Sequence, residues 1–185
     1  EPATLVQYAG VVVARLEDPS GDYGDWRVRK AALETLSRLA QSSSFAQHAF
    51  AVVAMLEDSD WQVRQGALKT LGELKPATLA WHADAVVARL TDSAEEVRFE
   101  ALRTLGELEP ATLVQYANAA LARLEDDDND VRDEAMLTLH ALPRFVTRPG
   151  DIFDSRSVRS RLLGRLGWYR CRLRLRAQRL ALYWY

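Results

Sequence analysis

The sequence of 185 residues contains a single cysteine, Cys171, and three histidines. One cysteine excludes a disulfide framework within the chain and any metal site built from several cysteines, and it suits a reducing compartment. The sequence also lacks a glycine-rich phosphate loop, a Gly-x-Ser-x-Gly motif, a His-Glu-x-x-His motif and a Cys-x-x-Cys pair. We therefore expect no catalytic residues, no metal ligands and no cofactor.

One acidic string has part of the pattern of a calcium-binding loop. Asp126, Asp128 and Asp130 have the alternate spacing of an EF-hand. However, Val131 stands where the loop requires glycine, and Leu137 stands where it requires a bidentate glutamate. We expect these carboxylates to cap the following helix instead, because the N-terminal end of a helix attracts negative charge.

What the chain does contain is a repeated unit, which is clearest in residues 76–109, PATLAWHADAVVARLTDSAEEVRFEALRTLGELE. Corresponding residues of the later copies, such as Phe45, Leu79 and Leu113, lie 34 residues apart. A fixed period in this range is typical of repeat arrays, in which each unit buries its apolar side against its neighbours. The first copy has a longer interhelical turn at residues 17–26, which we expect to be a surface loop, with partner binding as the alternative.

Each unit predicts two amphipathic helices. In the first half, apolar residues recur at i, i+4, i+7, i+8 and i+11, and in the unit quoted above they are Leu79, Ala83, Val86, Val87 and Leu90. The second half begins each time with a valine expected in the core, and these residues are Val28, Val63, Val97 and Val131. The turn between the halves is short, so the two helices of a unit should be antiparallel neighbours.

The ends of these helices also carry signals. The expected N-caps of the first helices are Thr4, Ser44, Thr78 and Thr112. Capping-box spacing occurs at the start of two second helices, in the pairs Ser59–Gln62 and Ser93–Glu96. Pro76 and Pro110 follow the last apolar residue of a second helix closely, and we expect them to stop that helix.

The string Leu-Glu-Asp-Ser-Asp-Trp-Gln-Val-Arg at 56–64 places an aspartate after the first helix and Val-Arg at the start of the second. On these residues the unit resembles a HEAT repeat over about residues 2–142. The resemblance implies an all-α fold, a right-handed α-solenoid of about four helix pairs. It also implies a ladder of hydrogen-bonded ion pairs between successive units, formed by Arg29, Arg64, Arg98 and Arg132 with Asp18, Asp58, Asp92 and Asp126.

The predicted domains follow the repeats and a change of charge. The array occupies residues 1–142, with units at about 2–41, 42–75, 76–109 and 110–142. Residues 1–143 contain 13 Lys and Arg against 24 Asp and Glu, a net charge of −11, whereas residues 144–185 contain 11 Arg and two Asp, a net charge of +9. Prolines and a glycine predict a linker at 143–155, followed by a basic, aromatic extension at 156–185.

The extension has several interpretations. Its arginines are too many for a transmembrane span. It could be an amphipathic helix on an anionic membrane surface, a nucleic-acid arm, or an element that docks on the array or on a partner protein. We favour docking and regard nucleic acid as the least favoured partner. The residues of the extension expected to bind a partner are Trp168, Tyr169, Arg170, Arg172, Arg174 and Trp184.

The array itself offers further candidates for partner binding. Phe50, Trp81, Phe99 and Leu137 occupy outward positions where most other copies have polar residues, and we add Arg103 to this set. Exposed aromatic residues are enriched among interface anchors, although single exposed apolar residues are common on any surface. In contrast, His48 and His82 share a column with Tyr8 and Tyr116, so we expect them to flank neighbouring helices and not to bind a metal.

The sequence thus predicts a non-catalytic scaffold or adaptor for protein partners in a multi-subunit assembly. The first alternative is a peripheral or linker subunit that the extension anchors to a larger assembly. That assembly could be membrane-bound and could belong to a plastid. Among HEAT-like enzymes, deoxyhypusine hydroxylase binds iron through His-Glu pairs, and this sequence has no His-Glu dipeptide. A HEAT-like phycobilin lyase or chromophore-handling protein is the more distant alternative.

Two expectations concern the source of the chain. The repeat sequence resembles HEAT arrays of algae and other protists, which suggests a plastid as one option within the intracellular location that we expect. The chain opens on Glu1 and Pro2, the wording that precedes a first helix in later copies. We therefore expect either a processed product or a piece of a longer array.

Overall fold

The structure, a computed structural model, describes residues 2–16, 26–39 and 45–142. In these ranges the chain is helical and forms no strands. All of them belong to one compact unit, Glu1–Pro143. None of the described helices is both long and apolar enough to cross a membrane.

The described helices form antiparallel pairs, as the periodicity predicts. The second helix of each pair is a single α-helix of 12 residues, and these are α2 (Trp26–Ser37), α4 (Trp61–Gly72), α7 (Glu95–Gly106) and α9 (Asn129–His140). The first helix of each pair, called its first arm below, is less regular. The first arms are α1 (Pro2–Ala14); η1 (Phe45–His48), α3 (Ala49–Ala54) and η2 (Met55–Glu57); α5 (Pro76–Leu79), η3 (Ala80–His82), α6 (Ala83–Ala88) and η4 (Arg89–Thr91); and α8 (Pro110–Ala122) with η5 (Arg123–Glu125).

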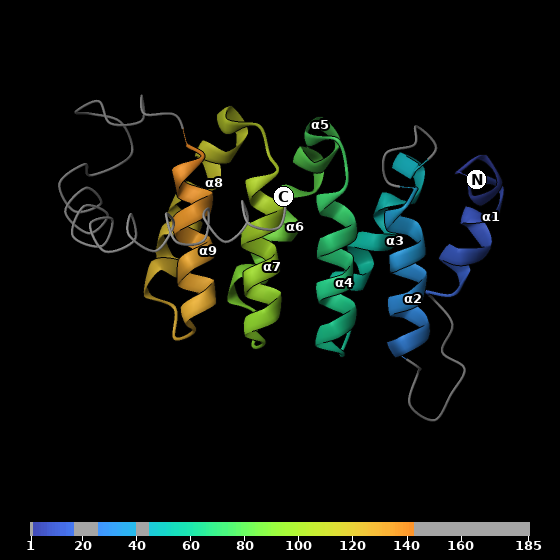
Figure 1. Ribbon diagram of the computed structural model, residues 1–185, viewed down its shortest axis with the longest axis horizontal. Helices are drawn as coiled ribbons and strands as arrows, with labels where there is room; N and C mark the ends of the chain where they lie inside the picture. Colours follow the sequence, from blue (N-terminus) through green and yellow to red (C-terminus); the bar gives the residue numbers. More distant parts are fainter. Residues whose placement is uncertain (1, 17–25, 40–44, 143–185) are drawn as a thin grey trace, which may run out of the picture. The chain divides into compact units, whose positions relative to one another are not determined.

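The second helices lie side by side in the order of the sequence (Figure 1). The strongest packing between pairs joins α2 to α4, α4 to α7 and α7 to α9, and each first arm packs on its own second helix. Each pair therefore buries its apolar stripe mainly against its neighbours, which makes this unit an α-solenoid. The most completely buried leucines include one at the same position of three successive second helices, Leu33, Leu68 and Leu102.

Val28 is an exception to the predicted core. Val63, Val97 and Val131 are fully buried, but Val28 is 43% exposed. The valines of α4, α7 and α9 are covered because another second helix packs alongside on the preceding side. Within the described residues no helix pair precedes α1 and α2, so the prediction that Val28 lies in the core is wrong.

The predicted N-caps of the first arms are also wrong. Pro76 and Pro110 are the first residues of α5 and α8, so Thr78 and Thr112 lie inside the first turn. Proline suits this position because its missing N–H would have no partner in the helix and its φ is already helical. Thr4 likewise lies inside α1, and Ser44 falls outside the described residues. The prolines therefore open the following helix as well as closing off the previous one.

The second helices are capped one residue later than expected. The Asp60 carboxylate accepts a hydrogen bond from the Gln62 N–H at 2.8 Å, and the Asp128 carboxylate accepts from the N–H groups of Asp130 and Val131. The N-cap of α7 is Ala94, which has no side-chain acceptor. The capping boxes expected at Ser59 and Ser93 are therefore absent. Asp128, in contrast, caps α9 as expected.

Candidate functional site

Paired arginines and aspartates connect successive repeats near the interhelical turns. Arg29 contacts Asp58 through Nε–Oδ2 at 2.7 Å and Nη2–Oδ1 at 3.0 Å. Equivalent two-point contacts join Arg64 to Asp92 at 2.8 and 2.7 Å and Arg98 to Asp126 at 2.9 and 2.7 Å. Two parallel N–H···O bonds give such pairs both strength and a fixed orientation. The structure thus contains three ion pairs of the ladder that the resemblance implied.

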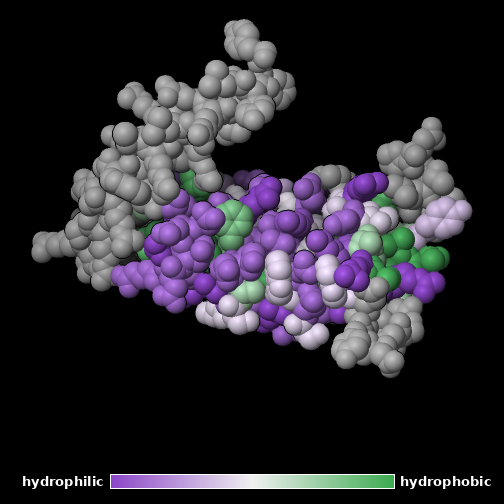
Figure 2. Space-filling view, turned by 60° about the horizontal axis from the view of Figure 1, so that its bottom comes forward, coloured by the Kyte–Doolittle hydropathy of each residue, from purple (hydrophilic) through white to green (hydrophobic). Residues whose placement is uncertain are grey.

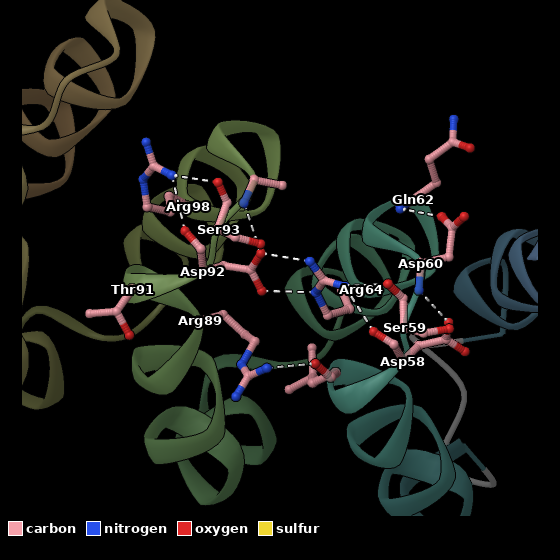
Figure 3. Close-up of polar contacts among 12 residues, drawn as sticks. Asp58, Ser59, Asp60, Gln62, Arg64, Arg89, Thr91, Asp92, Ser93 and Arg98 are labelled. Atoms are coloured by element: carbon pink, nitrogen blue, oxygen red, sulfur yellow. Dashed lines mark hydrogen bonds and ion pairs between the residues drawn. The ribbon is translucent and has the colours of Figure 1, made fainter.

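Each central arginine of this ladder also holds its own turn (Figure 3). Arg64 Nη1 donates to the backbone carbonyls of Asp58 at 2.8 Å and Ser59 at 3.1 Å. Arg132 makes the same contacts with the turn before α9 and also bonds Asn129, and among the described residues no later repeat supplies it with an aspartate. Asp18, the first aspartate of the expected ladder, falls outside the described residues.

The aspartates of the ladder are held as carboxylates. Burial alone would raise the pKa of Asp92, but the hydrogen bonds from Arg64 and the Ala94 N–H and the charges of Arg64 and Arg89 bring it below its ordinary value. The pKa of Asp126 is lowered against the same effect of burial by Arg98, the Asp128 N–H and Arg123. Because the side chains of Asp92 and Asp126 are only 5% and 3% exposed, each depends on its arginine for compensation.

A second ladder, which the sequence analysis missed, is made by threonines of the second helices. The hydroxyl of Thr104 donates to the Leu68 carbonyl of the preceding second helix at 3.1 Å. The hydroxyls of Thr70 and Thr138 reach the equivalent carbonyls of Leu33 at 3.2 Å and Leu102 at 3.0 Å, and each shares its hydrogen with a carbonyl of its own helix, at 2.8 and 2.9 Å. The signal was present in the sequence, because these threonines recur with the period of the repeat.

A third set of contacts joins the ends of the first arms. Arg89 Nη1 donates to the Leu56 carbonyl at 2.9 Å, and Arg123 Nη1 donates to the Leu90 carbonyl at 3.1 Å. Arg89 also pairs with Glu57 at 2.9 Å. Together the three sets fix the register between neighbouring repeats at both the first arms and the second helices.

A groove of about 410 Å³ lies across α2, α4 and α7 on the second-helix side of the array. Its floor over α4 includes Gly66 and Gly72, which bring no side chains. A Cβ on Gly66 would lie 3.3 Å from Leu33 Cδ1, so this glycine also allows α2 to approach α4 closely. A Cβ on Gly72 would meet only Thr104, at an ordinary 3.5 Å from its Oγ1. The middle one of the three helices therefore brings no side chains into the groove at these two points.

Glu100 of α7 lines this groove and is only 4% exposed. Its carboxylate pairs with Lys69 Nζ at 3.9 Å and Arg103 Nη1 at 3.7 Å, both longer than a hydrogen bond. Burial raises the pKa of Glu100 above its ordinary value, since the charges of Lys69 and Arg103 only partly oppose that effect. Nothing in the sequence alone distinguishes Glu100, because its surroundings arise from the side-by-side packing of three helices.

The outward aromatic residues lie on the first arms of two adjacent repeats. Phe50 is 73% exposed and Trp81 is 86% exposed. The ring of Phe50 meets the ring of His82 edge-on, with centroids 5.3 Å apart, and His82 directly follows Trp81 in the sequence. His82 itself is buried, and burial lowers its pKa. The aromatic pair Phe50 and Trp81 is thus a feature of the first arms, and the groove is a feature of the second helices.

The other candidate residues are spread over the second helices. Phe99 is half-buried on α7, and Leu137 on α9 is 37% exposed. Arg103 is exposed and belongs to the groove. Figure 2 shows a mostly hydrophilic surface on the side of the interhelical turns. The candidates of the extension, Trp168, Tyr169, Arg170, Arg172, Arg174 and Trp184, fall outside the described residues.

Titratable residues of the described part of the chain form no group that could hold a metal ion. The acidic string before α9 is accounted for by other contacts. Asp126 pairs with Arg98, and Asp128 caps the helix. These two aspartates of the string therefore serve the ladder and the helix terminus.

Comparisons with known proteins agree with this geometry. The family model described as HEAT repeats matches residues 49–140. Curated protein sequences give no match.

Three of the solved structures that are similar to this chain each share 17% sequence identity with it. An engineered protein has a TM-score of 0.56, with 83% of this chain and 67% of that chain covered. A designed armadillo repeat protein in complex with the peptide (KR)4 has a TM-score of 0.57, with 83% and 68% covered. The complex of CpcE and CpcF of phycocyanin lyase from Nostoc sp. PCC7120 has a TM-score of 0.54, with 85% and 97% covered. At this identity the likenesses show the fold alone.

Proposed function

Because this chain is a HEAT-repeat protein, we propose that it is a non-catalytic scaffold that binds other proteins through the exposed surfaces of its repeats. The observation that carries the proposal is the exposed aromatic pair, Phe50 and Trp81, on adjacent first arms. At the column of Trp81 the other copies have glutamine, and at the column of Phe50 they have glycine, aspartate and asparagine. Large aromatic side chains held in water on a rigid scaffold are typical of interface anchors.

The rigidity of the array supports the same function. The ladders join each repeat to the next through side chains that are mostly buried. An anchor placed on such a scaffold loses little conformational freedom on binding, which favours affinity. The partners proposed are proteins of a multi-subunit assembly. The designed armadillo neighbour was solved with a peptide, so a solenoid of this kind is able to hold one.

The extension at 156–185 is proposed as a second contact element for the partner. Its mixture of Trp168, Tyr169 and Trp184 with many arginines is what a docked anchor on an acidic surface requires. A chain that ends at Leu142 should keep its helical circular dichroism and lose the partner. Normal partner binding by that shortened chain would remove the extension from the proposal. The alternative role of the extension is to anchor the chain at a membrane surface, with a plastid membrane as one option.

The proposed function is tested with purified full chain and with the partner recovered with it from the cells of its source. Trp81→Ala and Phe50→Ala should each weaken binding by about tenfold or more, since loss of an anchor removes about 1–2 kcal/mol. Gln115→Ala, at the column of Trp81 in the last repeat, is the matched control and should bind normally. Unchanged binding by the Trp81 and Phe50 variants together would remove the aromatic pair as the anchor.

A second candidate function is chromophore handling. The observation that favours it is the structural likeness to the phycocyanin lyase complex, of which this chain covers 97% of one chain. Incubating the full chain with phycocyanobilin distinguishes the two candidates. A scaffold leaves the absorption spectrum of the bilin unchanged, whereas a chromophore-handling protein shifts it.

A further inference from the structure

The groove across α2, α4 and α7 is not used by the aromatic pair and has a chemistry of its own. Its volume of about 410 Å³ lies within the range of about 300–1,000 Å³ that is usual for ligand sites. It crosses three successive second helices, so an occupant that fills it runs across the helices. An extended peptide segment can run across helices in this way.

The sign of the charge in the groove selects the occupant. Four glutamates line it against three basic residues, and these are Glu34, Glu73, Glu100 and Glu107 with Lys30, Lys69 and Arg103. The most buried of these charges is Glu100, with its side chain 5% exposed, while the side chains of its partners Lys69 and Arg103 are 52% and 59% exposed. An anion placed beside Glu100 would meet a buried negative charge. A cation would meet an acceptor.

Glu100 also has unused capacity for hydrogen bonds. A carboxylate accepts about four hydrogen bonds. Among the described residues, the contacts of Glu100 are two ion pairs at 3.7 and 3.9 Å, both beyond hydrogen-bond distance. A guanidinium or ammonium group in the groove would supply the N–H donors that this buried carboxylate lacks, and a guanidinium would do so at two points.

We propose that this groove binds an extended segment of a partner protein, and that Glu100 accepts the side chain of an arginine or lysine in that segment. The proposal rests on the proposed function, because it takes the partner to be a protein. Gly66 and Gly72 leave room for the main chain of the segment over α4. The exposed glutamates Glu34 of α2 and Glu73, directly after α4, then face the remainder of a basic segment.

The probe for the test is a library of random twelve-residue peptides displayed on phage and selected on the immobilised full chain. Peptides recovered should share an arginine or lysine at one fixed position. One selected peptide, labelled with a fluorophore, should bind Glu100→Gln at least tenfold more weakly than the unchanged chain. Glu96→Gln, on the same helix α7 but outside the groove, should bind it normally.

A second pair of variants tests the place of binding without changing a charge. Gly72→Phe should abolish peptide binding by filling the groove, because its Cβ has ordinary space. Gly106→Phe is the matched control on α7, where a Cβ would meet only Thr138 at 4.0 Å, and should bind the peptide normally. Selected peptides without a fixed basic residue, or equal binding by Gly72→Phe and Gly106→Phe, would overturn the proposal.

These outcomes are separate from those of the proposed function. If Glu100→Gln and Gly72→Phe keep the natural partner while Trp81→Ala loses it, the scaffold function stands and the groove proposal fails. If the full chain binds selected basic peptides in the groove but no protein from its source, the groove stands as a peptide site and the scaffold function fails.

Discussion

Arg64 holds Asp92 of the following repeat with two parallel hydrogen bonds, Nε–Oδ2 at 2.8 Å and Nη2–Oδ1 at 2.7 Å. Its remaining nitrogen, Nη1, donates to the carbonyls of Asp58 and Ser59 in its own turn. One side chain thus ties a turn, a helix start and the next repeat together. The stability of a solenoid is approximately a sum over its repeats and the interfaces between them. Arg64 therefore contributes both to the stability of its own repeat and to that of the interface with the next one.

Arg64→Ala should therefore destabilise the array. The change leaves the Asp92 side chain, which is 5% exposed, without its cation, and the expected loss is about 1–3 kcal/mol in the free energy of unfolding. Urea denaturation followed by circular dichroism measures it. Arg98→Ala should behave in the same way, and Arg38→Ala, an exposed arginine just after α2, is the control. Neutral results for both ladder arginines would contradict the register described for these ion pairs.

The ladder also predicts a direction for the effect of acid. The pKa values of Asp92 and Asp126 are lowered in the folded chain, so the unfolded chain takes up protons first as the pH falls. The stability that these carboxylates contribute is fully present above their unfolded pKa of about 3.9 and is lost as the pH falls through their folded values. Urea midpoints measured from pH 7 to pH 2.5 should show this loss. The difference between the unchanged chain and Arg64→Ala should shrink over the same interval.

The pKa of Glu100 is shifted in the opposite direction to those of Asp92 and Asp126. Because burial raises its pKa in the folded chain, its ionised form is less favourable there than in the unfolded chain. Glu100→Gln should therefore be at least as stable as the unchanged chain at pH 7, and this advantage should shrink as the pH falls through the raised pKa. Thermal unfolding at pH 7 and pH 4 checks it. A clear loss of stability at pH 7 would show that Lys69 and Arg103 outweigh burial.

The threonine ladder predicts a smaller effect. Thr104→Val keeps the shape of the side chain but removes the hydroxyl that donates to the Leu68 carbonyl at 3.1 Å. The expected loss is about 0.5–1.5 kcal/mol in the free energy of unfolding. Thr35→Val is the matched control, because the Thr35 hydroxyl is exposed and bonds only within its own helix, to Ala31. Equal effects of the two changes would show that the bond between helices adds nothing.

The sequence predicted burial correctly at positions whose surroundings are the same in every repeat. The apolar period placed Val63 and Val97 in the core because their surroundings recur. It failed at Val28, since burial there depends on a neighbouring pair that the described chain does not supply. Helix starts were misplaced because Pro76 itself occupies the first helical position, and serine spacing at Ser59 could not reveal that the next aspartate is the cap.

An exposed position could be predicted from the sequence of one helix, whereas a groove formed by several helices could not. The outward position of Trp81 follows from one helix and its period, and the structure has it 86% exposed. The groove depends on α2, α4 and α7 lying side by side. It could therefore not be predicted from the glycines of α4 in the sequence. Phe99 was expected to point outward and be exposed, but its side chain is half-buried on α7. Whether Phe99 contacts a partner stays a prediction.

The most direct test of the scaffold function is oxidative footprinting of the tryptophans in the purified complex. Trp81 is 86% exposed on a first arm, and Trp61, 36% exposed at the start of α4, is the internal control. Hydroxyl-radical labelling with mass spectrometry should show strong oxidation of Trp81 in the free chain and its suppression when the partner is bound, with Trp61 unchanged. Equal oxidation of Trp81 in the free chain and in the complex would contradict the account.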